Sequence, residues 1–320
     1  MGDRLVAIGE ALIDFIPDRS GCEFREVGNF APMVGGAPAN VCGAFVKLGG
    51  KSSMLTQLGN DPFGGVIEQY LDDAGVDTTY LSKTDKANTA LAFVSLGKDG
   101  NRVFSFYRNP SADMLYSAED VPEIVFEDCY ALHFCSVSLG DFPMKDAHYK
   151  AIEYAKKNGA IISFDPNLRF PLWKSKEDLK KAVLEFIPYA DVLKISDEEI
   201  EFITGKTDIK EAAEMLLGMG PKLIIYTMGA DGAMGITSKA SVTSPQVKAK
   251  AVDTTGAGDG FIGSLLWKLH DYKIDAGSVS DVSEEVLKDS LSFANKFCAI
   301  SVTKKGAINS YPTLDEVNNV

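Results

Sequence analysis

The sequence predicts an α/β fold built on a mostly parallel central sheet, and two observations lead to this prediction. Apolar, strand-like runs alternate with segments of helical periodicity over most of the 320 residues. The strand-like runs are continuously apolar, as in parallel strands that are buried on both faces. Although the length alone suggests about two domains, the chain has no internal repeat and no linker that would separate independent domains. We therefore expect one domain over residues 1–320.

The expected elements follow each other along the chain. The main strands are expected at residues 5–9, 53–58, 131–135, 160–164, 192–195 and 223–227. The helices between them are expected at residues 37–48, 64–74, 145–158, 176–186 and 209–217. Two short strands at 233–237 and 242–247 and two helices at 258–269 and 286–302 complete the pattern. This order predicts a sheet with helices on both of its faces.

One part of the chain departs from this alternation. Residues 89–96 and 102–108 alternate in polarity and flank Gly97-Lys98-Asp99-Gly100-Asn101, a pattern typical of a β-hairpin. Residues 12–17 and 23–34 are also expected to be extended. We expect these pieces to form a small β lid, made of about residues 10–34 and 88–109 and inserted in the α/β core. Such a lid could also pair with a second copy of the chain, and the oligomeric state stays open.

Composition excludes several classes of function. The net charge of −13 makes nucleic acid and anionic membrane surfaces poor partners. No apolar run approaches the roughly 20 residues that a transmembrane helix needs. The first residues lead directly into a predicted strand without a signal peptide, so we expect a cytoplasmic protein. The five cysteines are odd in number and scattered, which favours free thiols over disulfides or a zinc site.

The most informative segment is Asp253-Thr254-Thr255-Gly256-Ala257-Gly258-Asp259-Gly260-Phe261. Small residues open a predicted helix here, so that its first backbone N–H groups are free to bind an anion such as phosphate. Asp259 lies in the same turn, where a carboxylate has no structural reason to accompany a bound anion. An anion site with its own carboxylate suits transfer of a phosphoryl group to a hydroxyl that the carboxylate deprotonates.

Two other glycine motifs do not fit this segment. A dinucleotide-binding fingerprint needs glycine at position 261, which is Phe261, and belongs at the start of its domain. A Walker-type loop needs Gly-Lys followed by Ser or Thr, which the segment lacks. The alternative without a ligand is a glycine-rich helix start, and the two flanking acids argue against it.

A second group of polar residues lies near the N-terminus. Gly35 and Gly36 would let the backbone approach a ligand closely, and Asn40 lies one helical turn further on, where its amide can bind a polyol. Asp14 follows a predicted strand and could accept two hydroxyl protons. The alternative is a plain glycine turn before a helix, with Asp14 as a solvated loop acid.

Three further strand ends carry candidate ligands. Asn167 and Arg169 could contact phosphate oxygens at the carboxyl edge of the sheet. Ser196 could cap the helix that follows Lys194, and Glu199 could hold magnesium through water, or the acids there could simply favour the helix dipole. The turn from Thr227 through Gly229 to Gly232 borders a nucleotide or is a plain hairpin turn.

Together these segments resemble the ribokinase-like (phosphofructokinase-B type) carbohydrate kinase family, and within it the bacterial fructokinases. The segments 35–40 and 253–259 match the signatures of the family, and 106–113 and 165–169 look like the fructokinase branch. The resemblance spans nearly the whole chain. It implies a three-layer α/β/α ribokinase-like fold with a small β lid, and an ATP:carbohydrate phosphotransferase.

The resemblance also implies a role for each matching residue. Asp259 would be the general base, and the N–H groups of Gly256, Ala257 and Gly258 would form the anion hole. The sugar would contact Asp14, Gly35, Gly36, Asn40, Tyr107, Arg108, Asn167 and Asp259, with Arg169 close to both sugar and phosphate. The nucleotide would lie against Lys194, Ser196, Thr227, Gly229, Gly232, Gly256, Gly258 and Asn295. A monovalent cation, which the family often uses, would lie near Asp253, Thr255, Ser301, Gly306 and Ser310.

Two positions depart from the family pattern. Ser196 stands where much of the family has Asn, which leaves the part of this position in metal binding open, while Glu199 is retained. Gly260 replaces a small residue that carries a Cβ, although glycine inside a helix costs up to about 1 kcal/mol. The sequence offers no explanation for Gly260.

These observations lead to one functional hypothesis and two alternatives. We expect ATP- and Mg²⁺-dependent phosphorylation of a primary sugar hydroxyl, O6 of fructose, with K⁺ as an additional cofactor to test. One alternative is a 2-keto-3-deoxygluconate kinase or another ribokinase-like sugar or nucleoside kinase. For the carboxylate of 2-keto-3-deoxygluconate, Arg108 and Arg169 could supply the extra cation. The other alternative is a sugar- or nucleotide-binding regulator without catalysis, against which the retained Asp259 argues.

Overall fold

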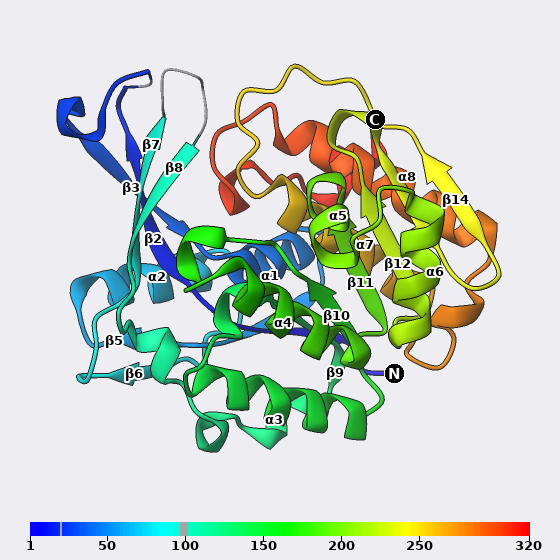
Figure 1. Ribbon diagram of the computed structural model, residues 1–320, viewed down its shortest axis with the longest axis horizontal. Coiled ribbons are helices and arrows are strands. Elements are labelled where there is room, and N and C mark those ends of the chain that lie inside the picture. The colour runs from blue at the N-terminus through cyan, green and yellow to red at the C-terminus, as the bar shows by residue number, and fades with distance from the viewer. Residues whose placement is uncertain (20, 97–101) are drawn as a thin grey trace.

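The computed structural model describes residues 1–19, 21–96 and 102–320, and its centre is an eight-stranded sheet (Figure 1). In spatial order the strands are β14 (Ser241–Ser244), β13 (Ala233–Ile236), β12 (Leu223–Thr227), β11 (Val192–Ser196), β10 (Ile161–Asp165), β9 (Cys129–Cys135), β1 (Arg4–Ile8) and β4 (Lys51–Leu55). All pairs from β4 to β12 are parallel, and β13 and β14 extend the sheet in antiparallel fashion. The mostly parallel sheet predicted from the sequence is therefore confirmed.

Helices cover both faces of this sheet. Alternate residues of β1 enter two different cores: Leu5 and Ala7 join one, and Val6 and Ile8 join the other. This is the period of two that a strand buried on both faces imposes. The first core is closed by α1 (Ala37–Lys47), α2 (Pro62–Asp73), α7 (Ala257–Asp271) and α8 (Glu284–Ser301). The second is closed by α3 (Met144–Lys157), α4 (Lys176–Phe186), α5 (Asp197–Thr204) and α6 (Ile209–Met219), and α9 (Leu314–Asn318) lies near the C-terminus.

A second sheet projects from this α/β body, as Figure 1 shows on its left side. Its strand order is β3 (Phe30–Gly35), β2 (Leu12–Pro17), β7 (Leu91–Leu96) and β8 (Arg102–Tyr107). The expected pairing of the two extended segments into one small sheet is observed. The predicted turn at residues 97–101 lies outside the described residues. We call these four strands the lid sheet; that they act as a lid stays a prediction.

The two faces of the lid sheet differ in character. On one face Phe93 stacks on Phe15 with ring centroids 4.6 Å apart, and it also contacts Phe30 and Tyr107. Phe106 precedes Tyr107 on β8, and because side chains alternate along a strand, it points to the opposite face. That opposite face lines a cavity, described below.

Three local expectations were wrong. Residues 24–26 are not extended but form a short 3₁₀ helix, because Glu23 and Glu26 make a reciprocal capping box. The strand expected at 242–247 ends at Ser244, since Pro245 has no N–H to donate. The strand expected at 53–58 is split into β4 and the short β5 (Gln57–Gly59), which pairs with β6 (Ser82–Thr84).

The contact between α1 and α7 fixes the helix that begins at the glycine-rich segment. A Cβ on Gly263 of α7 would lie 2.7 Å from Cβ of Ala44 and 2.9 Å from the carbonyl oxygen of Val41, both on α1. Glycine is therefore required here for the two helices to approach. In the described part of the chain, none of the helices combines the length and the apolar character needed to cross a bilayer.

We expect Gly263→Ala to lower the free energy of unfolding by roughly 1–3 kcal/mol, because it overpacks this contact. The matched control is Gly65→Ala in α2, where a Cβ would meet nothing within 4 Å. This control should be neutral or stabilise by up to about 1 kcal/mol, since alanine favours helix more than glycine. Urea unfolding of both variants measures the difference, and equal shifts would contradict the packing argument.

Candidate active site

Two cavities meet at the N-terminus of α7. The first, of about 510 Å³, lies between the lid sheet and the α/β body. The second, of about 380 Å³, lies over the carboxyl ends of β11 and β12. Both are lined by Asn167, Arg169, Lys194, Ala257 and Gly258. A group that moves between the two cavities must therefore pass the start of α7.

The start of α7 is open to an anion. Gly256 is the N-cap residue, in a left-handed conformation with φ of 73°, and it makes no side-chain cap. The Gly260 N–H closes the first helical bond to the Gly256 carbonyl at 2.8 Å. Among the described residues, the N–H groups of Gly258 and Asp259 have no acceptor. These groups carry the positive end of the helix dipole and can bind a phosphoryl group.

The predicted anion hole needs one adjustment. The N–H of Ala257 was assigned to the anion, yet it donates to the Thr254 carbonyl at 3.2 Å. This bond closes the turn that leads into α7. The N–H of Asp259, which the sequence did not single out, takes its place beside Gly258.

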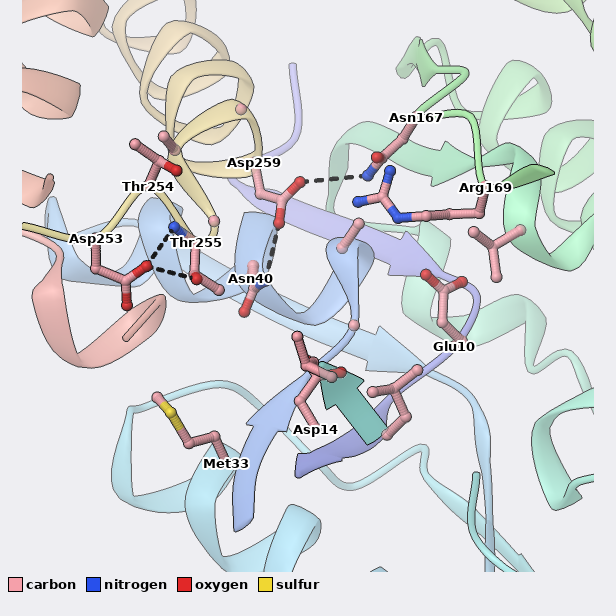
Figure 2. A pocket seen from close by; sticks show the side chains of 18 of the residues that line it. Glu10, Asp14, Met33, Asn40, Asn167, Arg169, Asp253, Thr254, Thr255 and Asp259 are labelled. Atoms are coloured by element: carbon pink, nitrogen blue, oxygen red, sulfur yellow. Dashed lines mark hydrogen bonds between the residues drawn. The ribbon is translucent and has the colours of Figure 1, made fainter. Parts of the chain in front are cut away.

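Asp259 points into the first cavity, as Figure 2 shows. Its Oδ2 accepts a hydrogen bond of 2.8 Å from Asn40 Nδ2, and Asn167 Nδ2 lies 3.5 Å from its Oδ1. Loss of water around the carboxyl raises its pKa to about 6, and the charge of Asp165 acts in the same direction. The Asn40 hydrogen bond and the charge of Arg169 partly oppose this rise. Asp259 is thus mostly ionised at neutral pH and basic enough to take a proton.

The wall of the first cavity suits a polyhydroxylated ligand. It is lined by Asp14 of β2, by Gly36, which caps the start of α1, and by Asn40 of α1. Gly36 has a φ of 113°, and a Cβ there would lie 2.5 Å from the Glu10 carbonyl, so glycine is required. The Oδ1 of Asn40 is buried and has no donor among the described residues. A buried acceptor without a partner is costly, and a ligand hydroxyl would satisfy it.

A buried ion pair lies beneath the junction of the cavities. Lys194 Nζ is 2.7 Å from Asp165 Oδ2, and both side chains are less than a tenth exposed. A Cβ on Gly258 would lie only 3.5 Å from Lys194 Nζ, so the ammonium group faces the start of α7. Lys194 has a raised pKa: burial opposes the charged form, but the charges of Asp165 and Glu199 outweigh it. The ammonium group therefore stays charged and can face a phosphate.

The second cavity contains the predicted nucleotide contacts. It is lined by Lys194, Ser196, Glu199, Thr227, Gly229, Gly232, Gly258 and Asn295. Gly256, which was also assigned to the nucleotide, lines the first cavity instead, because it precedes the helix. Asn295 Nδ2 donates to the Ser244 carbonyl at 3.1 Å and to the Pro245 carbonyl at 3.2 Å, so its amide also holds the end of β14.

Glu199 is both a helix cap and a wall of the second cavity. Its Oε2 accepts from the Ser196 N–H at 3.0 Å, and its Oε1 accepts from the Leu168 N–H at 2.9 Å. Ser196 and Glu199 form a reciprocal capping box at the start of α5. Each carboxylate oxygen keeps a second lone pair, so the arrangement fits a water-bound magnesium ion.

The residues predicted around a monovalent cation form two hydrogen-bonded groups. Asp253 Oδ1 accepts from the Thr255 N–H at 3.0 Å, and its Oδ2 accepts from the Gly306 N–H at 3.0 Å. Ser301 Oγ and Ser310 Oγ lie 2.8 Å apart and are buried. The Asp253 carboxylate and the hydroxyls of Thr255, Ser301 and Ser310 are oxygen ligands of the kind that hard cations take. The segment 301–310 thus packs against the turn before α7.

Three predicted sugar contacts do not line either cavity. Tyr107 is 63% exposed on the outer face of the lid sheet, and strand alternation places Phe106 in the cavity instead. The Arg108 guanidinium is buried against Asp113, with Nε 2.9 Å from Asp113 Oδ2, and it also donates to the Val137 carbonyl at 3.1 Å. Gly35 acts indirectly, because a Cβ there would overlap the Asp14 carboxylate.

Some cavity residues were not found from the sequence. Glu10 is buried, accepts from Ser138 Oγ at 3.1 Å and lines the first cavity; burial raises its pKa to about 7, and the charge of Arg108 limits the rise. Val94 and Phe106 line the cavity from the lid sheet. Side chains alternate between the two faces of a strand. Val94 and Phe106 lie on the same face of the lid sheet as Asp14, so the sequence alternation in the expected hairpin could have identified them. No sequence signal marks Glu10 beyond its place after a strand.

Comparisons with known proteins agree with this geometry. The sequence profile of the pfkB family carbohydrate kinases matches residues 3–314. Fructokinase-2 of Solanum lycopersicum is 44% identical over 313 residues, which cover 98% of this chain and 94% of that protein. The crystal structure of a fructokinase with bound ATP from Xylella fastidiosa has a TM-score of 0.92 at 33% identity, covering 100% and 98% of the two chains. A double-mutant fructokinase from Vibrio cholerae O395, in its fructose-, ADP- and potassium-bound form, has a TM-score of 0.86 at 33% identity, covering 99% and 97%.

We expect Asn40→Ala to raise the pKa of Asp259 above its value of about 6, because the variant removes the hydrogen bond that favours the carboxylate. NMR titration of protein labelled with ¹³C at aspartate Cγ measures this pKa. The label excludes Glu10, and Asp259→Asn assigns the signal. An unchanged or lower pKa in Asn40→Ala would show that this hydrogen bond does not stabilise the charged form.

Proposed function

This chain belongs to the pfkB family of carbohydrate kinases, and from this premise we propose that it transfers the γ-phosphoryl group of ATP to O6 of fructose. The observation that carries the proposal is the position of Asp259. Its carboxylate faces the cavity with the polyol-binding wall, beside N–H groups at the point where the two cavities meet. A base and an anion site in this relation are what phosphoryl transfer to an alcohol requires.

In the proposed reaction, each residue of the site has its own role. Asp14 and Asn40 hold the sugar in the first cavity, and Asp259 takes the proton from the attacking hydroxyl. The N–H groups of Gly258 and Asp259 bind the phosphoryl oxygens as charge develops on them. Arg169 and Lys194, which line both cavities, offset the charge of the migrating group. The adenine nucleotide lies in the second cavity.

ATP and cations complete this proposal. Glu199 would hold Mg²⁺ through water, and this ion would neutralise the phosphate charge when bound. Asp253, Thr255, Ser301, Gly306 and Ser310 would surround a monovalent cation behind the anion site. The structure of the Vibrio cholerae fructokinase with fructose, ADP and potassium supports K⁺ as this cation.

Charge in the first cavity favours a neutral sugar over 2-keto-3-deoxygluconate. Among the described residues, five acidic side chains line this cavity, Glu10, Asp14, Asp165, Asp253 and Asp259, against three basic ones, Arg169, Lys194 and Lys305, and Lys194 is paired with Asp165. Arg108, the other candidate partner for the carboxylate of that sugar acid, is paired with Asp113. The fructokinase names of the relatives support fructose in particular. Within the proposal, Arg169 remains for the phosphoryl group rather than for a substrate carboxylate.

The lid sheet would close over the sugar and exclude water that would otherwise hydrolyse ATP. Its cavity face carries apolar side chains, among them Val94 and Phe106. A second copy would pair through the lid sheet and the adjoining 3₁₀ helix 24–26, where Tyr107 and Phe24 are 63% and 44% exposed. ATP use also fits the cytoplasmic location predicted from the sequence.

The direct test is ADP release measured over a panel that contains fructose and 2-keto-3-deoxygluconate. We expect turnover with fructose, and Asp259→Asn should lower kcat at least ~100-fold while sugar binding persists. Asp73→Asn, at the exposed end of α2, is the matched control and should keep full turnover. Near-normal turnover of Asp259→Asn would remove this residue from the mechanism. A wild-type protein that binds sugar without releasing ADP would support the regulator instead.

A further inference from the structure

The segment 306–311 packs behind the turn that carries the anion site. Gly306 donates its N–H to Asp253 Oδ2 at 3.0 Å, at the start of that turn. Tyr311 donates its hydroxyl to the Gly256 carbonyl at 2.7 Å, at the end of the turn. We propose that Tyr311 is a positioning residue for phosphoryl transfer, which fixes Gly256 and thereby aims the free N–H groups of α7. The inference rests on the proposed function of this site.

The side chain of Tyr311 is itself held in place. It is 3% exposed, and its ring lies 5.3 Å from the ring of Phe297 on α8. Its backbone N–H closes the short 3₁₀ helix Ile308–Ser310 by donating to the Ile308 carbonyl at 3.3 Å. A hydroxyl on a ring so confined can set the position of the group that it binds.

The Gly256 carbonyl is the point at which α7 begins. It accepts two hydrogen bonds, one from Tyr311 Oη and one from the Gly260 N–H at 2.8 Å. The peptide unit is planar, so the direction of this carbonyl also fixes the N–H of Ala257. The N–H groups of Gly258 and Asp259 follow in the same helical turn. A shift of the Gly256 carbonyl would therefore move the first turn of α7 and, with it, the N–H groups of Gly258 and Asp259.

Two glycines make room for Tyr311. A Cβ on Gly256 would lie 2.7 Å from Tyr311 Oη, and a Cβ on Gly260 would lie 3.0 Å from Cε1 of Tyr311. Phe297 Cε1 is equally close to the position of the Gly260 Cβ. The departure of Gly260 from the family pattern, unexplained by the sequence, thus follows from the approach of the Tyr311 and Phe297 rings to the first turn of α7.

The first test removes only the hydroxyl. Tyr311→Phe should lower kcat roughly 5- to 10-fold, the effect of losing one neutral hydrogen bond, with KM for fructose and for ATP within about twofold. Tyr130→Phe is the matched control, because Tyr130 Oη is buried and has no partner among the described residues. This control should leave kcat unchanged. A kcat of Tyr311→Phe within about twofold of the wild-type value, or a loss shared by Tyr130→Phe, would overturn the proposal.

A second test uses the contact between Gly260 and the tyrosine ring. Gly260→Ala should lower kcat by a similar factor, because its Cβ displaces the ring and with it the hydroxyl. In a Tyr311→Ala background the same substitution should change kcat less than about twofold. Circular dichroism confirms that each variant is folded. Equal losses in both backgrounds would assign the effect of Gly260→Ala to another contact and contradict the proposal.

A binding measurement separates this inference from the proposed function. ADP with aluminium fluoride imitates the phosphoryl group during transfer, and water can take the place of the sugar hydroxyl. Tyr311→Phe should weaken its binding roughly 5- to 10-fold relative to wild type and leave the binding of ADP alone unchanged. Failure of fructose turnover in the wild-type protein would reject the proposed function only. Equal affinity of both proteins for the aluminium fluoride complex would reject the role of Tyr311.

Discussion

The proposed reaction depends on one electrostatic constraint: a carboxylate that accepts a proton must lie beside a site that binds an anion. Asp259 and the free N–H groups of Gly258 and Asp259 are parts of one helical turn. The Asp259 carboxylate and an anion bound at these N–H groups would repel each other, and the chain as a whole carries a net charge of −13. The positive end of α7, Arg169 and the buried Lys194 offset that repulsion. Asp165 in turn offsets part of the charge of Lys194.

The parallel sheet brings the parts of this site together. Asp165, Ser196 and Thr227 end three neighbouring parallel strands, β10, β11 and β12, and open α/β sheets bind ligands at that edge. The lid sheet adds the opposite wall of the first cavity through β2 and β7. The C-terminal segment, through Gly306 and Tyr311, supports the turn from behind. Segments from nearly every part of the chain therefore meet at the start of α7.

Sequence analysis predicted the layers of the fold because continuous apolar strands and helical periods are local signals. It also pointed to Asp259 and Asn40, which line the first cavity, since glycine-rich turns mark both of their segments. It misplaced Tyr107, although strand alternation alone assigns Phe106 to the cavity. The burial of Arg108 against Asp113, the pairing of Lys194 with Asp165 and the fit of Tyr311 against Gly260 depend on contacts in three dimensions. No local pattern encodes such contacts, so the sequence could not predict them.

A crystal structure of the protein with ADP, aluminium fluoride and fructose tests the central claim most directly. The account predicts the fluoride group between the two cavities, about 3 Å from the backbone nitrogens of Gly258 and Asp259. A sugar hydroxyl should lie between this group and the carboxylate of Asp259. A fluoride group bound away from the start of α7, or a sugar whose hydroxyls do not reach Asp259, would contradict the account.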